Sequence, residues 1–236
     1  MRAVTFVALV WLCAAMHGAA AAAVPKSISA RYDVYMNGMH IAKMTESFES
    51  VNGEYRLVSE SQAVGVLALF HRRPARFVSS GRLIPSGLQP QRFEGQRGDR
   101  ESRRVRGEFD WAAGRLTIEH DGRTEHLPLA AGTQDRLSVM YQFMFLVPDG
   151  QRELSISMTN GRKLDRYLYA IRPGTEVDTP LGRLAAVHLV RQRRQNENAT
   201  EVWLSPEHRH LPVKMTIVEE DGSRYEQVAT RIEIIP

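Results

Sequence analysis

The chain has 236 residues and a formal net charge of +4, and 43% of its residues are hydrophobic and 25% charged. This composition is typical of a globular protein and excludes a fibrous or largely disordered one. The single cysteine, Cys13, excludes a disulfide framework and any metal site built from several cysteines. A chain of this length can bury a sizeable core without such cross-links.

The first 23 residues have the pattern of a secretory signal peptide. Arg2 provides a positive start, residues 3–15 are apolar apart from Thr5, and residues 19–23 are all alanine. Such a start, apolar stretch and small-residue cleavage site direct export. We therefore expect residues 1–23 to be removed, together with Cys13, and residues 24–236 to form a periplasmic protein with one domain.

Two other interpretations of the N-terminal segment are weaker. A retained transmembrane anchor needs about 20 continuous apolar residues, and His17 and Gly18 interrupt this run. A lipidated Cys13 would need small residues before it, where Trp11 and Leu12 stand. After Ala23 no apolar run is long enough to cross a membrane, so we expect no transmembrane anchor once the signal is removed.

Turn dipeptides dominate the rest of the chain. Five Asn-Gly or Asp-Gly pairs, each between strand-like segments, begin at Asn37, Asn52, Asp121, Asn160 and Asp221. These dipeptides favour the type I′ turn of a β-hairpin, because both central residues need a positive φ. Repeated five times, the signal predicts an antiparallel meander. Further strands are expected at residues 75–81, 88–96, 103–110, 182–193 and 199–204.

Two apolar segments interrupt the strand pattern. Residues 134–147 have a helical repeat of apolar positions, with Thr133 as the expected cap, Asp135 at the positive end of the helix dipole and Pro148 as the stop. A helix that is apolar on nearly every side is buried. Residues 64–70 are short and continuously apolar. We therefore predict a mainly β fold: a large curved antiparallel sheet or unclosed barrel of about a dozen strands, with one apolar helix packed on its concave side.

Catalytic and cofactor motifs are lacking. The sequence has no G-x-S-x-G, G-x-G-x-x-G or P-loop pattern, and no partner can be assigned to Ser79 or Ser138. His208 and His210 have the spacing of two metal ligands on a strand, but they follow Pro206 in an expected turn, where histidines are usually solvated. We expect no enzyme activity, no metal and no cofactor.

Arginines gather in the predicted hairpin around residues 88–110, at Arg92, Arg97, Arg100, Arg103, Arg104 and Arg106. Glutamate and aspartate residues alternate with them, so we interpret the group as a polar outer face. An anionic lipid head group or a surface polysaccharide is the alternative, because arginine binds phosphate and carboxylate groups with two hydrogen bonds. Nucleic acid is not expected, since no aromatic residues for base stacking lie among these arginines.

The two apolar segments are the best indication of function. Beside a curved sheet they could line a cavity for an acyl chain, and the candidate ligand-binding residues are Val66, Leu67, Leu69, Phe70, Met140, Phe143 and Met144. The first hypothesis is therefore a periplasmic protein that binds an apolar or lipid-derived ligand. The alternative is an interaction or scaffold protein of the cell envelope, with a packed interior and an open strand edge or apolar patch as its binding surface.

Four short motifs, in this order, resemble an uncharacterised bacterial family, the domain of unknown function numbered 3108. They are Tyr32-Asp33-Val34-Tyr35 with Gly38, Gln134-Asp135-Arg136-Leu137-Ser138, Thr179-Pro180-Leu181-Gly182, and Glu201-Val202-Trp203-Leu204 with Leu211-Pro212-Val213 and Asp221-Gly222. The resemblance implies an exported bacterial protein and transfers no catalytic residue.

The spacing between Trp203 and Leu211-Pro212 is similar, more distantly, to that of periplasmic lipoprotein carriers. That resemblance implies an unclosed barrel with a helical lid over an apolar cavity. Fold alone does not fix function.

Overall fold

The computed structural model describes residues 24–70, 73–98, 104–146, 150–193 and 197–236. The expected signal peptide, Cys13 and the expected helix stop at Pro148 lie outside these ranges, so the signal peptide stays a prediction.

Within these ranges fifteen strands form one sheet, and its spatial order follows the chain in two meanders. The first meander contains β1 (Ser27–Met36), β2 (Met39–Val51), β3 (Glu54–Ala63), β4 (Ala75–Ile84), β5 (Gly87–Arg97), β6 (Arg104–Asp110), β7 (Arg115–His120) and β8 (Arg123–Pro128). The second contains β9 (Gln134–Asp135), β10 (Glu153–Thr159), β11 (Leu164–Thr179), β12 (Gly182–Gln192), β13 (Ala199–Ser205), β14 (Leu211–Val218) and β15 (Arg224–Ile235).

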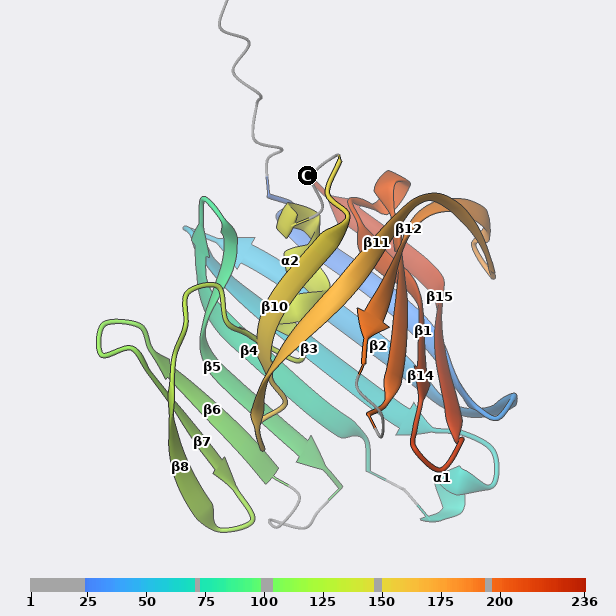
Figure 1. The fold of residues 1–236 in the computed structure, drawn as a ribbon. Coiled ribbons are helices and arrows are strands. Elements are labelled where there is room, and N and C mark those ends of the chain that lie inside the picture. The colour runs from blue at the N-terminus through green and yellow to red at the C-terminus, as the bar shows by residue number, and fades with distance from the viewer. Residues whose placement is uncertain (1–23, 71–72, 99–103, 147–149, 194–196) are drawn as a thin grey trace, which may run out of the picture.

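The two meanders are joined by the first and the last strand of the chain, β1 and β15. In the described part of the chain they are not paired with each other at β8 and β9, which lie near the middle of the chain. Strand β1 pairs antiparallel with β15 across ten residue pairs from Ser27 opposite Ile235 to Met36 opposite Tyr225. The sheet curves round until β8 and β9–β10 face each other across a gap, so the barrel stays unclosed (Figure 1). Among the described strands every pairing is antiparallel except that of β9 with β10. The predicted curved, mainly β fold is confirmed, with a larger sheet than the expected dozen strands.

The five predicted turns all connect neighbouring strands, but they do not share one turn type. Asn37, Asn52 and Asp121 have φ near +50°, and each is followed by a glycine with positive φ, as the type I′ turn requires. Asn160 and Asp221 differ, because only the following glycine has a positive φ. Their loops are longer, and their side chains accept hydrogen bonds from the backbone of residues two positions on.

The predicted helix exists as α2 (Ser138–Leu146), shorter at its start than expected. Residues 134–135 form strand β9, and the N-terminal cap is Asp135 rather than Thr133. The Asp135 carboxylate accepts hydrogen bonds from the backbone N–H of Leu137 and of Ser138, both at 2.8 Å. Ser138 Oγ in turn accepts the N–H of Asp135 at 2.9 Å. This reciprocal bonding satisfies donors that the first turn of a helix leaves free, and it fixes the start of α2.

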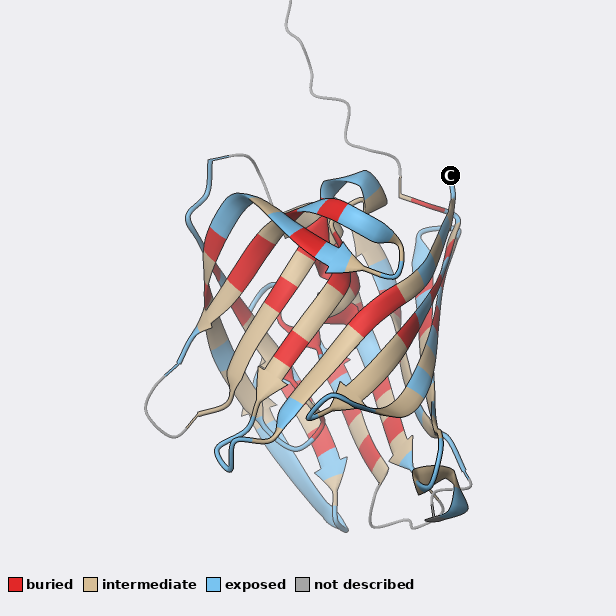
Figure 2. Ribbon diagram, turned by 90° about the vertical axis from the view of Figure 1, so that its right-hand side faces the viewer, coloured by how far each residue is buried: buried red, intermediate tan, exposed pale blue. Residues whose placement is uncertain are grey.

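The core lies between α2 and the concave side of the sheet, and Figure 2 shows buried residues alternating with less buried ones along the strands. Tyr141 of α2 stacks on Phe48 of β2 at 5.6 Å between ring centroids, within a cluster that includes Leu57, Phe93 and Leu116. A second cluster surrounds Phe143 with side chains of β10 to β13. The helix therefore joins the two meanders across the gap.

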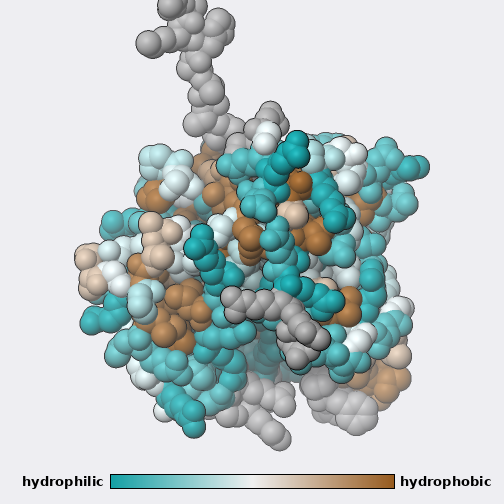
Figure 3. All heavy atoms as spheres, viewed as in Figure 1, coloured by the Kyte–Doolittle hydropathy of each residue, from teal (hydrophilic) through white to brown (hydrophobic). Residues whose placement is uncertain are grey.

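The remaining elements are short. Helix α1 (Leu67–Phe70) follows β3 at the end of the sheet away from α2 (Figure 1), and the 3-10 turn η2 (Pro206–His208) precedes β14. Among the described residues no helix has the length and apolar character needed to cross a membrane. Hydrophilic residues cover most of the face shown in Figure 3, with apolar residues in separate small groups.

Candidate functional site

The predicted ligand-binding residues on α2 lie inside the core. Phe143 is buried in the cluster next to β10 and β11. Met140 contacts both clusters, and Met144 packs against the cluster around Phe48. These side chains fill the space between the helix and the sheet.

The other predicted residues lie elsewhere. Val66, just before α1, is 72% exposed, and Leu69, within α1, is 70% exposed. Leu67, the first residue of α1, is partly buried. The side chain of Phe70 lies outside the described part of the structure. Because α1 and α2 occupy different ends of the molecule (Figure 1), the structure does not bring the two apolar segments together. A ligand role for these seven residues stays a prediction.

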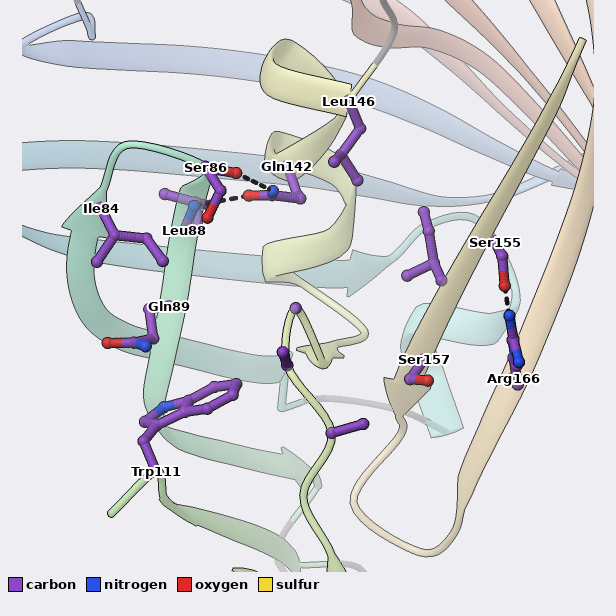
Figure 4. A pocket seen from close by; sticks show the side chains of 14 residues that line it. Ile84, Ser86, Leu88, Gln89, Trp111, Gln142, Leu146, Ser155, Ser157 and Arg166 are labelled. Carbon is purple, nitrogen blue, oxygen red and sulfur yellow. Dashed lines mark hydrogen bonds between the residues drawn. The ribbon is translucent and has the colours of Figure 1, made fainter. Parts of the chain in front are cut away.

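A groove beside α2 is the better-formed candidate (Figure 4). It has a volume of about 380 Å³ and lies between the β4–β5 turn and β10. One group of lining side chains is apolar: Ile84, Leu88, Trp111, Leu146 and Ile156. A second group is polar: Gln89, Ser155, Ser157 and Arg166. Sequence reasoning missed these residues, because they come from segments that are distant in the sequence and lie near one another only across the gap between the two meanders.

Gln142 fixes the inner wall of this groove. Its Nε2 donates to the carbonyl of Ser86 at 2.8 Å, and its Oε1 accepts the N–H of Leu88 at 2.6 Å. Gly87, between them, has a φ of +114°, and a Cβ there would lie 2.3 Å from Gln142 Oε1. The helix is thus fastened directly to the backbone of the β4–β5 turn.

The outer wall of the groove is a strand edge. Ile171 N–H donates to the carbonyl of Arg152, so the backbone carbonyl of Arg152 points toward β11. Backbone groups alternate in direction along a strand. The backbone groups of Ser155 and Ser157, an odd number of residues further on, therefore point away from β11. Within the described residues β10 pairs with β9 only at Met158 and Thr159. The backbone groups of Ser155 and Ser157 are therefore hydrogen-bond donors and acceptors in the wall of the groove. Beside them, Arg166 Nε donates to Ser155 Oγ at 2.7 Å.

A buried polar cluster lies under the start of α2. Ser79 Oγ donates to Asp135 Oδ2 at 2.5 Å, and the Tyr55 hydroxyl lies 3.0 Å from Ser79 Oγ. Burial raises the pKa of Asp135, although the hydrogen bonds from Ser79, Ser138 and Leu137 oppose that shift. Ser79 and Asp135 are both completely buried, so this serine hydroxyl is not accessible to a substrate.

Glu46 of β2 is a second buried acid, 7% exposed. The Tyr141 hydroxyl donates to its carboxylate at 3.2 Å, and Ser59 lies directly opposite it on β3. Burial raises the pKa of Glu46 to about 7, against the lowering effects of Tyr141, Ser59 and the charge of Arg136. At neutral pH this carboxyl group is therefore near its midpoint between the neutral and the charged form.

The expected turn histidines do not form a metal centre with a third ligand. His208 Nδ1 lies 3.0 Å from Ser205 Oγ, whereas Glu201 is 2.8 Å from Nε2 of His188. In the part of the chain that the structure describes, no three His, Cys, Asp or Glu side chains are grouped so that they could hold a metal ion.

The family model described as "Protein of unknown function (DUF3108)" matches residues 31–229. The chain belongs to this family. The match spans both meanders, so DUF3108 covers almost the whole sheet, including α2 and both walls of the groove. The motif that begins at Gln134 is accordingly part of the DUF3108 region. No curated protein matches the chain.

Solved structures that are similar to this DUF3108 chain share little sequence with it. The hypothetical protein CT021 from Chlamydia trachomatis is 8% identical, with 89% of this chain and 88% of that chain covered and a TM-score of 0.38. A "putative lipoprotein" from Parabacteroides distasonis is 8% identical, with 89% and 96% covered and a TM-score of 0.34. A "putative exported protein" with a YmcC-like fold from Bacteroides fragilis is 9% identical, with 87% and 95% covered and a TM-score of 0.31.

Proposed function

We propose that this chain is a non-enzymatic protein exported to the periplasm, and that it binds an amphipathic, lipid-derived ligand in the groove beside α2. The observation that supports the proposal is that one group of side chains lining the groove is apolar and another group is polar. Its volume of about 380 Å³ is within the usual range for ligand pockets of roughly 300–1,000 Å³.

The apolar part of the lining would bind an acyl chain. Trp111, Leu146 and Ile156 contribute side chains from three different segments, and Trp111 is held in place because its Nε1 donates to the carbonyl of Pro90 at 2.6 Å. Burying apolar ligand surface contributes about 25 cal/mol for each Å² removed from water. A single acyl chain of moderate length would therefore supply the main binding energy.

The polar part would orient the head group. Arg166 and the Ser155 and Ser157 hydroxyls lie on the β10–β11 side of the groove. A guanidinium group binds carboxylate and phosphate oxygens with two hydrogen bonds, so an anionic or hydroxyl-rich head group suits this side. The ligand would lie with its tail toward α2 and its head toward β11.

A second candidate function is protein binding at the cell envelope, and the exposed edge of β10 favours it. Extended segments of a partner can add to such an edge by main-chain hydrogen bonding. The backbone groups of Ser155 and Ser157 are the ones available, and they line the same groove, so lipid and peptide would compete there.

The test is to express the full chain in a Gram-negative bacterium, purify it from the periplasmic fraction without detergent and measure its mass under native conditions. We expect a co-purifying lipid near a one-to-one ratio, identified by solvent extraction. Ala131→Trp, at an exposed position in the groove lining, should remove it. Ala185→Trp, on the exposed side of β12, is the matched control and should retain it.

A ligand-free mass, together with no binding of a fluorescent fatty acid, would contradict the lipid proposal and leave the protein-binding candidate. Retention of the chain in the cytoplasm would contradict the export proposal. Circular dichroism of both tryptophan variants establishes that they are folded, so that loss of ligand reports on the groove.

A further inference from the structure

Three arginines from different segments line a second cavity, separate from the groove of Figure 4. This cavity has a volume of about 350 Å³ and is lined by Phe77, Arg97, Val105, Arg136, Asn160 and Arg162. It is formed by β4, β5 and β6 on one side and by the β10–β11 turn on the other. It shares no lining residue with the groove, so a ligand here is independent of the proposed function.

The ring of Phe77 is a platform for two of the guanidinium groups. The Cζ atoms of Arg97 and Arg136 lie 5.7 and 4.7 Å from the ring centroid. Gly95 makes room for this ring, because a Cβ on Gly95 would lie 2.5 Å from the Phe77 side chain. The aromatic face holds the two arginines in defined positions, so the arrangement is built into the fold.

The β10–β11 turn closes the other side of the cavity. Gly161 packs so tightly there that an added Cβ would lie 2.8 Å from Val105, and Arg162 forms an ion pair with Asp121 of the β7–β8 turn. These contacts place Asn160 and Arg162 opposite Arg97 and Arg136. The turn therefore supplies a third guanidinium group and an amide to the same space.

Positive charge in this cavity exceeds the negative charge beside it. Within the described residues, Arg97 and Arg136 form no salt bridge, and Asp121 is shared between Arg162 and His120. The nearby buried acids are Asp135 and Glu46, whose own pKa values are raised by burial. The positive charges of Arg97 and Arg136 are thus held close together, and their repulsion costs free energy unless an anion lies between them.

Arg136 is unlike the residues around it in the 134–138 motif. Gln134, Asp135, Leu137 and Ser138 are all buried, and each has a structural role at the start of α2 or in the core. Of these five residues only Arg136 is exposed, and it lines the cavity. The surrounding cavity walls and the charge of Arg97 lower the pKa of Arg136 to about 10, so it still carries its positive charge at neutral pH.

We propose that the cavity lined by Arg97, Arg136 and Arg162 is a binding site for a phosphate group. Guanidinium groups converge on phosphate oxygens with paired hydrogen bonds, and the amide of Asn160 supplies a further donor. At about 30 Å³ for each water-sized group, the cavity is larger than one phosphate ion requires. The ligand is therefore a phosphate ester, either the head group of a phospholipid or a soluble phosphosugar.

The test compares three probes on the purified protein: inorganic phosphate, glucose 1-phosphate and vesicles of phosphatidylglycerol, with phosphatidylcholine vesicles as the uncharged reference. Binding is followed by calorimetry for the soluble probes and by flotation for the vesicles. We expect saturable binding of glucose 1-phosphate or of phosphatidylglycerol vesicles, and the probe that binds more tightly identifies the source of the ester. Phosphate should also raise the unfolding temperature more than chloride does at equal ionic strength.

Arg136→Gln and Arg97→Gln should each weaken binding at least tenfold, while Arg136→Lys, which keeps the charge, should weaken it less. Arg162→Gln provides a third variant on a separate element, in case a change next to Asp135 impairs folding. The matched control is Arg92→Gln on the same strand as Arg97, because Arg92 is 64% exposed and pairs with Glu108. Absence of binding to all three probes would overturn the proposal, as would equal loss in the Arg92 variant.

Discussion

Ser79 Oγ donates a hydrogen bond of 2.5 Å to Asp135 Oδ2, and through it β4 holds the residue that caps α2. The other carboxylate oxygen of Asp135 accepts two backbone N–H groups of the helix. One buried carboxylate therefore connects the first meander to the start of the helix that spans the gap. The position of α2 against the sheet depends on these hydrogen bonds.

Asp135→Ala should destabilise the fold by about 3 kcal/mol, because it leaves the N–H groups of Leu137 and Ser138 and the hydroxyl of Ser79 without their acceptor. Each buried donor left unpaired costs ~1–3 kcal/mol. Urea denaturation followed by tryptophan fluorescence measures the change. Asp178→Ala, at an exposed position of β11, should change the free energy of unfolding by less than ~0.5 kcal/mol; similar losses in both variants would contradict the assigned role.

Glu46 should make the protein less stable as the pH rises from 4.5 to 7. Its pKa is raised from 4.5 to about 7 in the folded protein, so the unfolded chain loses its proton first, and the free energy of unfolding falls across this window. The difference corresponds to roughly 3 kcal/mol, and buried Asp135, whose pKa is also raised, acts in the same direction.

Glu46→Gln stays neutral and should lose part of this pH dependence. We expect the variant to be more stable than the parent at pH 8 and similar to it at pH 4, in urea denaturation at each pH. Glu60→Gln is the control, because Glu60 is 48% exposed and pairs with Arg76. A Glu46→Gln profile that parallels the parent profile would show that this carboxyl group is not the cause.

Gly161 and Gly222 allow backbone strain to be separated from steric overlap. Both have φ near +85°, but an added Cβ meets Val105 and Phe93 at Gly161 and nothing within 4 Å at Gly222. Gly222→Ala should cost ~1 kcal/mol from strain alone. Gly161→Ala should cost a further ~1–3 kcal/mol from overpacking. Equal melting temperatures for the two variants would mean that the β10–β11 turn does not pack against β6.

Gln142→Leu should destabilise the protein by about 2 kcal/mol, since the backbone N–H of Leu88 and carbonyl of Ser86 would lose their partner in the core. Hydrogen exchange gives the sharper measurement. The Leu88 amide should exchange faster in the variant, whereas the Leu57 amide in the middle of β3 should lose less protection. An unchanged Leu88 exchange rate would contradict the hydrogen bond to Gln142.

Local patterns in the sequence were sufficient to predict the meander. Each of the dipeptides Asn37-Gly38 and Asn52-Gly53 is sufficient to predict a hairpin turn. The alternation of a strand is likewise visible from residues that are close together in the sequence. The helix was also predicted from its own spacing, although its start was placed four residues early. The reason is that Asp135 caps it through its own side chain, while Gln134 and Asp135 pair with Met158 and Thr159 of β10.

Features that depend on the gap between the meanders could not be predicted. Trp111 and Ser155 line one groove, and Arg97 and Arg136 share one cavity, yet each pair is about 40 residues apart in the sequence. Their proximity is set by how far the sheet curves before it stops. Arg92 and Arg97 are both exposed, as the sequence predicts for a polar face. Arg97 also lines the cavity beside Phe77, because strand alternation sends the side chains of residues an odd number apart to opposite faces.

The pairing of β1 with β15 has a consequence for how the chain folds. Every other antiparallel pair among the described strands links neighbours in the sequence, and such pairs can form as soon as each turn closes. Residues such as Ser27 and Ile235 must instead meet over some 200 intervening residues, and contacts of that separation slow folding. We expect the two meanders to form first and then to pair with each other through β1 and β15. Pairing of β15, the last strand, would then complete the sheet and set its final curvature.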